Sequence, residues 1–277
     1  MMDDLRAGEP GRGRQIVIAM PTIGRFLSRG REPETHERRR LKITAGDRPV
    51  YVVGDVHGCL DALIALEKRI LQDAEKFPGD KLIVMLGDYI DRGPDSAGVI
   101  DHLTGKPPAG FERICLLGNH EAALLDYLDG GIDLVTWLGL GSDTTLASYG
   151  IDPHATEGLV GGGQRARSLL ASGIPDGHIE FMRSLPILVE TDRYVCVHAG
   201  LKPGVAIDKH SDHELIWSRP SGDDAAFAKW IIHGHTPTDA VRREGRRINL
   251  DTGIFHTGRL SALRIWKNKA RILSNRD

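Results

Sequence analysis

The chain has 277 residues, of which 40% are hydrophobic and 27% are charged, a balance typical of soluble globular proteins. A chain of this length can bury a full hydrophobic core and form one catalytic domain. The formal net charge of −2 excludes a general electrostatic attraction to nucleic acid or to a membrane surface. No apolar stretch approaches the roughly 20 residues that a membrane span needs, and none has the length of a signal-peptide core.

The cysteines Cys59, Cys115 and Cys196 form no CxxC pair. An odd number without paired spacing argues against a disulfide scaffold, and a reducing compartment fits this usage. Each cysteine lies in or beside an apolar run, so we interpret all three as small buried hydrophobic residues. We therefore expect a cytoplasmic protein with no membrane partner.

The first 48 residues differ in composition from the rest of the chain. Residues 1–40 contain nine arginines and six acidic residues with scattered glycine and proline, which predicts a flexible, mildly basic arm over 1–48. The arm is expected to be a solvated tail or a docking segment for a substrate or partner. Basic residues are not interleaved with aromatic residues there, so a nucleic-acid partner is not favoured. The catalytic domain is predicted at 49–277.

Strand and helix patterns alternate three times after the arm. Apolar runs at 50–53, 81–86 and 113–117 predict buried strands. A helix is predicted after each strand, at roughly 59–76, at about 95–103 and up to residue 128. Repeated strand–helix units favour a mostly parallel sheet with right-handed crossovers.

From about 130 to 180 this regular alternation lapses. Glycine-rich pieces alternate with helical segments near 165–172 and 176–185, and we interpret the region as an inserted cap. Such a cap can select substrates, or it can simply cover the sheet. Further strands are predicted at 187–189, 194–197, 230–232, 247–250, 259–266 and 270–273, the last three antiparallel. The predicted fold class is α/β, with two packed mixed β-sheets flanked by helices.

Side chains of metal-ligating type follow the predicted strands at the point where each strand ends. They are Asp55, His57, Asp88, Asn119, His120, His198 and His235. Oxygen and imidazole donors without thiolates suit Mn²⁺, Fe, Zn²⁺ or Mg²⁺, and they disfavour a structural zinc site of the cysteine type. The set is large enough for two ions, which usually share a carboxylate. Asp88, after the middle strand, is the expected shared ligand.

Three ordered motifs carry a family resemblance. The sequences GDVHG at 54–58, GDYIDRG at 87–93 and GNHE at 118–121 resemble the signature of the PPP-type, calcineurin-like metallophosphoesterases. These include serine/threonine protein phosphatases and their bacterial and phage relatives. HAG at 198–200, IWSR at 216–219 and GHTP at 234–237 match the later blocks in the same order. The resemblance spans about 50–255 and implies the family's four-layer sandwich of sheets and helices.

The resemblance also implies a binuclear metal centre. Asp55, His57 and Asp88 would hold one divalent ion. The second would be held by Asp88, Asn119, His198 and His235. Mn²⁺ is the favoured metal, with Fe, Zn and Mg as alternatives. A hydroxide bridging the two ions would attack phosphorus in line.

The remaining motif residues are expected to serve the phosphate and the leaving group. Arg92 and Arg219, with Asn119, would bind phosphate oxygens in a forked geometry. His120 would protonate the leaving oxygen, oriented by Asp91. His233 competes with His235 for the last ligand position. His235 fits the motif better, so we interpret His233 as a residue that lies behind the ligands and does not bind the metal itself. Glu121 and Asp251 are given no chemistry, although Glu121 could start or cap a helix.

These implications predict an enzyme, a metal-dependent phosphomonoester hydrolase. A serine/threonine protein phosphatase of the bacterial and phage branch is favoured, with phosphoproteins and small phosphoesters as substrates. The alternative is a hydrolase of diadenosine tetraphosphate or another dinucleoside polyphosphate. Asp91 and Glu121 favour the phosphatase, since the symmetrical diadenosine tetraphosphatases typically differ from this chain at both positions. A catalytically silent binding module is not favoured, because no motif residue is missing.

Overall fold

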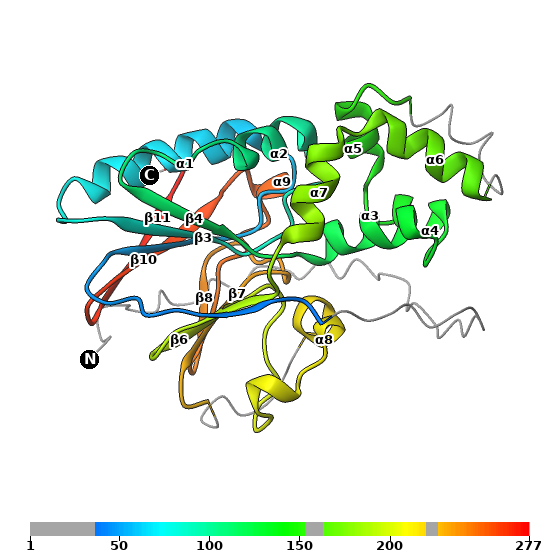
Figure 1. The fold of residues 1–277 in the computed structure, drawn as a ribbon. Helices are drawn as coiled ribbons and strands as arrows, with labels where there is room; N and C mark the ends of the chain where they lie inside the picture. Colours follow the sequence, from blue (N-terminus) through cyan, green and yellow to red (C-terminus); the bar gives the residue numbers. More distant parts are fainter. Residues whose placement is uncertain (1–36, 153–162, 220–226, 277) are drawn as a thin grey trace.

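The computed structural model describes residues 37–152, 163–219 and 227–276, and two β-sheets packed face to face form its centre (Figure 1). One sheet has five strands in the order β11-β10-β2-β3-β4, and the other has six in the order β1-β5-β6-β7-β9-β8. Both sheets are mixed, and helices lie outside them. The predicted α/β architecture with two packed mixed sheets is confirmed.

The five-stranded sheet contains the three parallel strands that the motifs follow. They are β2 (Val50–Val53), β3 (Lys81–Met85) and β4 (Phe111–Cys115). In the register, Val53 pairs with Met85 and Met85 pairs with Cys115, so all three strands end in line. The loops that carry the motifs therefore leave the sheet at one edge. The antiparallel strands β10 (Ser261–Trp266) and β11 (Lys269–Ser274) complete the sheet beside β2.

The six-stranded sheet contributes the later motifs. β6 (Tyr194–Val197) and β7 (Trp230–His233) are parallel neighbours, so the residues after them also leave at one edge. The other strands of this sheet are β1 (Arg40–Lys42), β5 (Leu188–Glu190), β8 (Arg242–Glu244) and β9 (Arg247–Asn249). β9 pairs in parallel with β7 and antiparallel with β8. The antiparallel prediction for 247–250 is therefore wrong with respect to β7.

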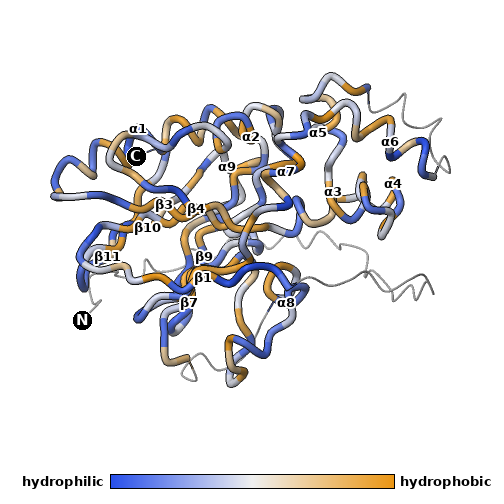
Figure 2. The backbone as a smooth tube through the Cα atoms, in the orientation of Figure 1, coloured by the Kyte–Doolittle hydropathy of each residue, from blue (hydrophilic) through white to orange (hydrophobic). Residues whose placement is uncertain are grey.

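Alternation along β2 and β3 divides the core into two layers. Val52 and Val84 face the other sheet and pack with residues such as Ile232, whereas Tyr51 and Ile83 face the helices. Strands buried on both faces are apolar at every position. Figure 2 shows hydrophobic stretches gathered along the strands of both sheets. The outer layer on the five-stranded sheet contains α1 (Leu60–Ala74) and α2 (Ser96–Thr104).

The described residues of the insert form four helices, which lie beside α3 (Asn119–Asp129) at one side of the molecule (Figure 1). They are α4 (Leu134–Leu138), α5 (Asp143–Ser148), α6 (Gly163–Gly173) and α7 (Asp176–Ser184). Trp137 is fully buried and stacks on Tyr127 of α3 with ring centroids 5.2 Å apart. The predicted cap is thus packed onto the domain by an aromatic contact, and its residues 153–162 lie outside the described part.

The predicted boundary of the arm at residue 48 is wrong. β1 pairs in parallel with β5, with Arg40 opposite Leu188. The Arg38 Nη1 donates to the carbonyl oxygens of Met182, Arg183 and Leu185 at the end of α7. Residues 37–48 are therefore part of the domain, because their backbone completes a sheet edge. Residues 1–36, predicted to be a solvated tail or a docking segment, lie outside the described residues.

Short helices connect the remaining strands. They are the 3₁₀ helix Ile207–Lys209, α8 (Asp212–Trp217) and α9 (Ile254–Thr257). None of the helices in the described ranges combines the length and the apolar character needed to cross a bilayer. All three cysteines are free thiols. Cys115 and Cys196 are buried as predicted, whereas Cys59 is only partly buried.

Candidate active site

The strand-end residues meet at the common edge of the two sheets. All seven predicted ligand-type side chains are buried, with none more than 9% exposed. Asp88 lies among them after β3, and His198 reaches it from the opposite sheet, with Nε2 3.3 Å from Asp88 Oδ1. Strands of both sheets therefore deliver their polar residues to one place, as predicted.

The backbone at the site is strained. Among the described residues, six non-glycine residues have positive φ, and five belong to the site: His57, Asp88, Asp91, Arg92 and His235. Left-handed φ costs such residues of the order of 1–3 kcal/mol each and persists only where the surroundings hold it. These loops are therefore held in place by the contacts around them.

The Glu121 carboxylate accepts hydrogen bonds from four backbone N–H groups of these loops. Its Oε1 accepts the N–H groups of Tyr89 and Ile90 at 2.7 and 3.2 Å. Its Oε2 accepts those of Asp88 and Gly118, both at 3.0 Å. Burial, with Asp88 nearby, raises the pKa of Glu121 to about 7. No chemistry was predicted for Glu121 beyond starting or capping a helix. It is the third residue of α3, a position where a glutamate side chain can accept the N–H of the N-cap residue, here Gly118.

The glycines before the ligands allow the loops to pack against one another. At Gly87, where φ is +106°, a Cβ would lie 2.6 Å from the Gly118 nitrogen. A Cβ on Gly118 would overlap the backbone nitrogen and Oδ1 of Asp88. Glycines that directly precede ligand-type residues are typical of sharp turns or of a close approach of metal to the backbone. In this structure they mark the close approach of one motif loop to the next.

One group of donors gathers around the Asn119 amide oxygen. His198 Nε2 lies 2.9 Å and His235 Nδ1 2.8 Å from Asn119 Oδ1. The other ring nitrogen of His198 lies 3.0 Å from the carbonyl oxygen of Leu86 and can donate to it. Nε2 is then the ring nitrogen that faces the Asn119 and Asp88 oxygens, and it can share a cation with them once it has lost its proton. Asp88, His198 and His235 form one cluster of possible metal ligands.

A second group lies on the other side of Asp88. The Nε2 atoms of His57 and His120 are 3.7 and 3.8 Å from Asp88 Oδ2. His57 Nδ1 lies 3.0 Å from the carbonyl oxygen of Ile90, so its Nε2 is available as a ligand. His57, Asp88 and His120 form the second cluster of possible ligands, and Asp88 belongs to both. The geometry thus brings His120 beside the residues predicted to hold the first ion.

Asp55 lies next to these groups. Its Oδ2 accepts the His235 N–H at 2.9 Å, while its buried Oδ1 has no hydrogen-bond partner among the described residues. Asp55 is not in either ligand cluster. Asp251 is buried nearby, and its Oδ1 accepts the Gly253 N–H at 2.9 Å, while Oδ2 has no hydrogen-bond partner in the part of the chain that the structure describes.

The electrostatics of the site fit divalent cations. Burial, and then Asp251, raise the pKa of Asp55, and burial raises the pKa of Asp251 to about 6. Burial also opposes ionisation of Asp88, but the facing His198 and His120 outweigh it and lower the pKa of Asp88. Buried carboxylates with an unpaired oxygen need positive charge. Two cations among these oxygen and imidazole donors would supply it.

A buried histidine–carboxylate pair borders the clusters. His120 Nδ1 lies 2.7 Å from Asp91 Oδ2, and both side chains are at most 1% exposed. Burial opposes protonation of His120, but Asp88 and Asp91 outweigh it and raise the pKa of His120. The pair has the geometry predicted for an oriented proton donor.

Two arginines flank the ligand groups. Arg92 Nη1 lies 3.1 Å from His57 Nε2, and its guanidinium stacks 4.8 Å from the centroid of the Phe255 ring. Arg219 is exposed and lies near enough to His235 to add to the effect of burial, which lowers the pKa of that histidine to about 3. Phe255 is 41% exposed. It was not identified from the sequence, since no motif contains it.

His233 lies behind the ligand set. Its Nδ1 is 3.1 Å from the Gly234 carbonyl oxygen, and burial lowers its pKa to about 4. With Arg219 it lines a hollow of about 140 Å³. Of the two, His235 shares a cluster of possible ligands with Asp88 and His233 does not, among the described residues.

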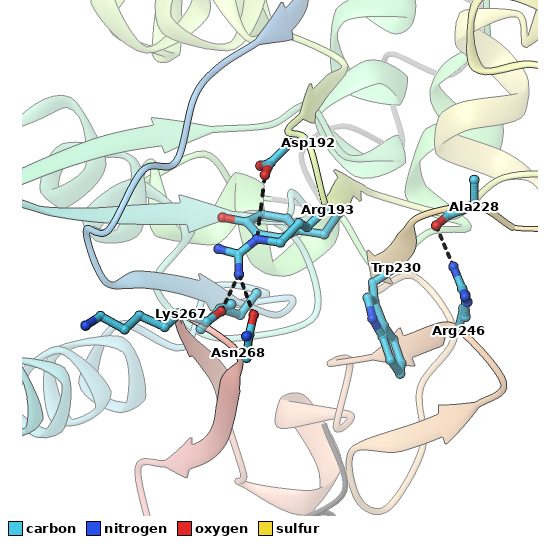
Figure 3. Close-up of a pocket in the computed structure, with 9 residues that line it drawn as sticks. Asp192, Arg193, Ala228, Trp230, Arg246, Lys267 and Asn268 are labelled. Carbon is cyan, nitrogen blue, oxygen red and sulfur yellow. Dashed lines mark hydrogen bonds and ion pairs between the residues drawn. The ribbon is translucent and has the colours of Figure 1, made fainter. Parts of the chain in front are cut away.

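Another hollow, of about 330 Å³, lies away from these groups at the start of β6 and β7 (Figure 3). Arg193 donates there to the Lys267 carbonyl oxygen and to Asn268, and Arg246 donates to the Ala228 carbonyl oxygen. These cations are engaged by the protein itself. The nine residues that line this hollow include none of the predicted site residues.

Known proteins resemble this chain in sequence. The chain is 28% identical over 235 residues to the asymmetrical bis(5'-nucleosyl)-tetraphosphatase PrpE of Geobacillus thermodenitrificans, covering 78% of this chain and 89% of that protein. The PrpE of Bacillus subtilis is 25% identical over 235 residues, with 77% and 89% covered.

Solved structures resemble it at lower identity. A putative diadenosine tetraphosphatase matches with a TM-score of 0.59 at 20% identity, covering 86% of this chain and 98% of that one. A protein serine/threonine phosphatase of Saccharomyces cerevisiae matches with a TM-score of 0.51 at 16% identity, with 86% and 84% covered. The family model of the calcineurin-like phosphoesterases matches residues 48–259. The chain therefore belongs to the calcineurin-like phosphoesterases and is a metallophosphoesterase hydrolase.

Proposed function

We propose that this enzyme is a phosphomonoester hydrolase that acts on phosphorylated serine and threonine side chains. The observation that carries the proposal is the buried pair of His120 and Asp91, 2.7 Å apart, beside the ligand clusters. An alkoxide is a poor leaving group and needs a proton in the transition state. A positioned acid therefore contributes most when the bond to an alcohol oxygen is broken.

Two divalent ions would be held by the residues already described. Asp55, His57 and Asp88 would hold one, and the second would lie among Asp88, Asn119, His198 and His235. Bound ions of this kind supply a nucleophilic water at neutral pH and neutralise phosphate charge. Mn²⁺ is the proposed metal, because carboxylate, amide and imidazole donors without sulfur suit it.

The chain's own side chains bind the substrate and move the proton. Arg92 and Arg219 bind phosphate oxygens from the two sides of the site, and Asn119 adds an amide contact. Asp91 accepts from His120 Nδ1, which leaves Nε2 to deliver its proton to the leaving oxygen. Strained backbone at Asp91 and Arg92 places both groups before substrate arrives.

A second candidate is hydrolysis of bis(5'-nucleosyl) tetraphosphates. The names of the PrpE relatives, at 24–28% identity, favour it. The leaving group would then be a nucleotide phosphate, which is far less basic than an alkoxide and gains little from a general acid. Under this second candidate, the His120–Asp91 pair would therefore contribute less to the rate.

Rates measured side by side distinguish the two candidates. The purified protein with Mn²⁺ is offered a phosphoserine/phosphothreonine peptide, a phosphotyrosine peptide and diadenosine tetraphosphate. We expect the highest kcat/KM on the phosphoserine/phosphothreonine peptide, and no turnover of any substrate by Asp88→Ala purified in the same way. A dominant rate on the dinucleotide would establish the second candidate instead. A cytoplasmic location is part of the proposal and is checked by fractionating cells.

A further inference from the structure

The insert reaches the proton donor through a single threonine. Thr145 of α5 donates through Oγ1 to Asp91 Oδ1 at 2.7 Å, while His120 Nδ1 approaches Asp91 Oδ2 at 2.7 Å. All three side chains are at most 1% exposed. We propose that Thr145 is a positioning residue for His120 and acts through Asp91. The proposal rests on the proposed function, in which His120 protonates the leaving oxygen.

Thr145, Ser96 and Asp91 are all hydrogen-bonded to one another. The Asp91 N–H is shared between Thr145 Oγ1 at 2.8 Å and Ser96 Oγ at 3.0 Å. The two hydroxyls are 2.9 Å apart. A threonine hydroxyl has one proton, and Thr145 gives it to the Asp91 carboxylate, so Ser96 must donate to Thr145. Each hydroxyl then has a defined orientation, which makes the network rigid.

The same part of the insert also holds the strained turn. Asp91 and Arg92 both have φ of 69°. The Arg92 N–H donates to the Gly141 carbonyl oxygen at 2.9 Å. A threonine within a helix has few side-chain rotamers, so its hydroxyl is fixed relative to the helix backbone. Gly141 thus fixes the backbone of the turn, and Thr145 fixes the Asp91 carboxylate.

A consequence follows for substrates with different leaving groups. With Oδ1 held by Thr145, the Asp91 carboxylate cannot rotate away from His120, and the imidazole keeps its proton on Nδ1 and its direction toward the site. Without that hold the donor is misdirected, while the ion ligands and arginines are unchanged. Alkyl esters should then slow more than aryl esters, because an aryl leaving group needs little protonation.

The kinetic test compares Thr145→Val with Thr145→Ser. Thr144→Val is the matched control, since the Thr144 hydroxyl donates to the Gly141 carbonyl oxygen and not to Asp91. Each protein is assayed with Mn²⁺ on a phosphoserine peptide and on 4-nitrophenyl phosphate. We expect Thr145→Val to lower kcat on the peptide about tenfold, part of the roughly 10²–10⁴-fold that a positioned acid contributes. The rate on 4-nitrophenyl phosphate should fall less than about twofold in Thr145→Val. Thr145→Ser keeps the hydroxyl and should turn over both esters at close to the wild-type rate.

A spectroscopic readout does not depend on turnover. The Nδ1 proton of His120, bonded to a buried carboxylate, should give a low-field ¹H NMR signal that is absent from His120→Asn. The signal should shift or broaden in Thr145→Val and stay unchanged in Thr144→Val. If Thr145→Val does not fold, Ser96→Ala removes the hydroxyl that donates to Thr145 and shares the Asp91 N–H, while the bond from Thr145 to Asp91 Oδ1 stays. It should give a smaller effect with the same substrate order.

The outcomes separate this inference from the proposed function. An equal loss on both esters in Thr145→Val, or a Thr145→Ser as slow as Thr145→Val, overturns the positioning role of Thr145 alone. If His120→Asn slows both esters equally, or loses bound metal by elemental analysis, His120 is not the proton donor. The proposed function then fails together with the inference.

Discussion

The two sheets contribute to the site in different ways. The five-stranded sheet supplies long motif loops in which His57, Asp88, Asp91 and Arg92 all have positive φ. The six-stranded sheet supplies two imidazoles, of which only His235 has positive φ, and His198 lies within hydrogen-bonding distance of the Leu86 carbonyl oxygen. One side thus carries strained backbone held by a buried carboxylate, and the other carries ligands set directly on strand ends. The difference indicates that the loops after the five-stranded sheet do most to fix the positions of the site's side chains.

The largest expected difference between the two sheets is in how many metal ions a variant loses. Asp88 belongs to both ligand clusters and His235 to one. Asp88→Ala should therefore lose both ions and all turnover, whereas His235→Ala should lose one. The measurement is the Mn²⁺-to-protein ratio by elemental analysis after equilibration and desalting. The exposed Asp208→Ala is the control, and equal ratios in the two site variants would show that Asp88 does not link the clusters.

Stability gives the next contrast. Glu121→Gln replaces one acceptor oxygen by an amide NH₂, which leaves backbone N–H groups of the strained loops facing a donor. Each buried unpaired donor costs about 1–3 kcal/mol, so the free energy of unfolding should fall by at least that amount. Urea unfolding measures it. Glu112→Gln, at an exposed pair with Arg48, should change stability by less than about 1 kcal/mol. Equal effects would mean that Glu121 does not hold the loops.

The smallest expected effect lies on the side of the six-stranded sheet. Arg219→Lys keeps the charge but loses the forked geometry, and a lost hydrogen bond to a charged group should raise KM about tenfold. Arg242→Lys, which lines the same hollow, is the control and should leave KM unchanged. Steady-state kinetics on a phosphoserine peptide test this. An unchanged KM in Arg219→Lys would remove Arg219 from the phosphate site.

Sequence patterns predict the centre of this molecule better than its periphery. β2, β3, β6 and β7 are continuous apolar runs that end in ligand-type residues, so both the strands and their meeting point could be inferred. β1 is a three-residue strand with charged side chains on both sides of Leu41, and such edges have no apolar pattern to detect. β4 begins at Phe111, earlier than predicted, because its first half is only partly buried.

The residues that support the site were harder to find than the residues that form it. Glu121 follows a motif histidine, but its four backbone partners depend on how two loops fold together. Thr145 is 54 positions from Asp91, and nothing in its local sequence separates it from Thr144. Phe255 reaches Arg92 from α9 without any motif. Side chains that act across such sequence distances become visible only in the folded chain.

The pairing of β1 with β5 limits how far the protein can be shortened. Starting the chain at residue 49 would expose the backbone of β5 as an unpaired edge, which invites pairing between molecules. It would also remove Arg38 and Arg40, whose guanidinium groups donate to carbonyl oxygens at the end of α7 and beside α8. A soluble minimal version of this enzyme should therefore keep every residue from 37 onward.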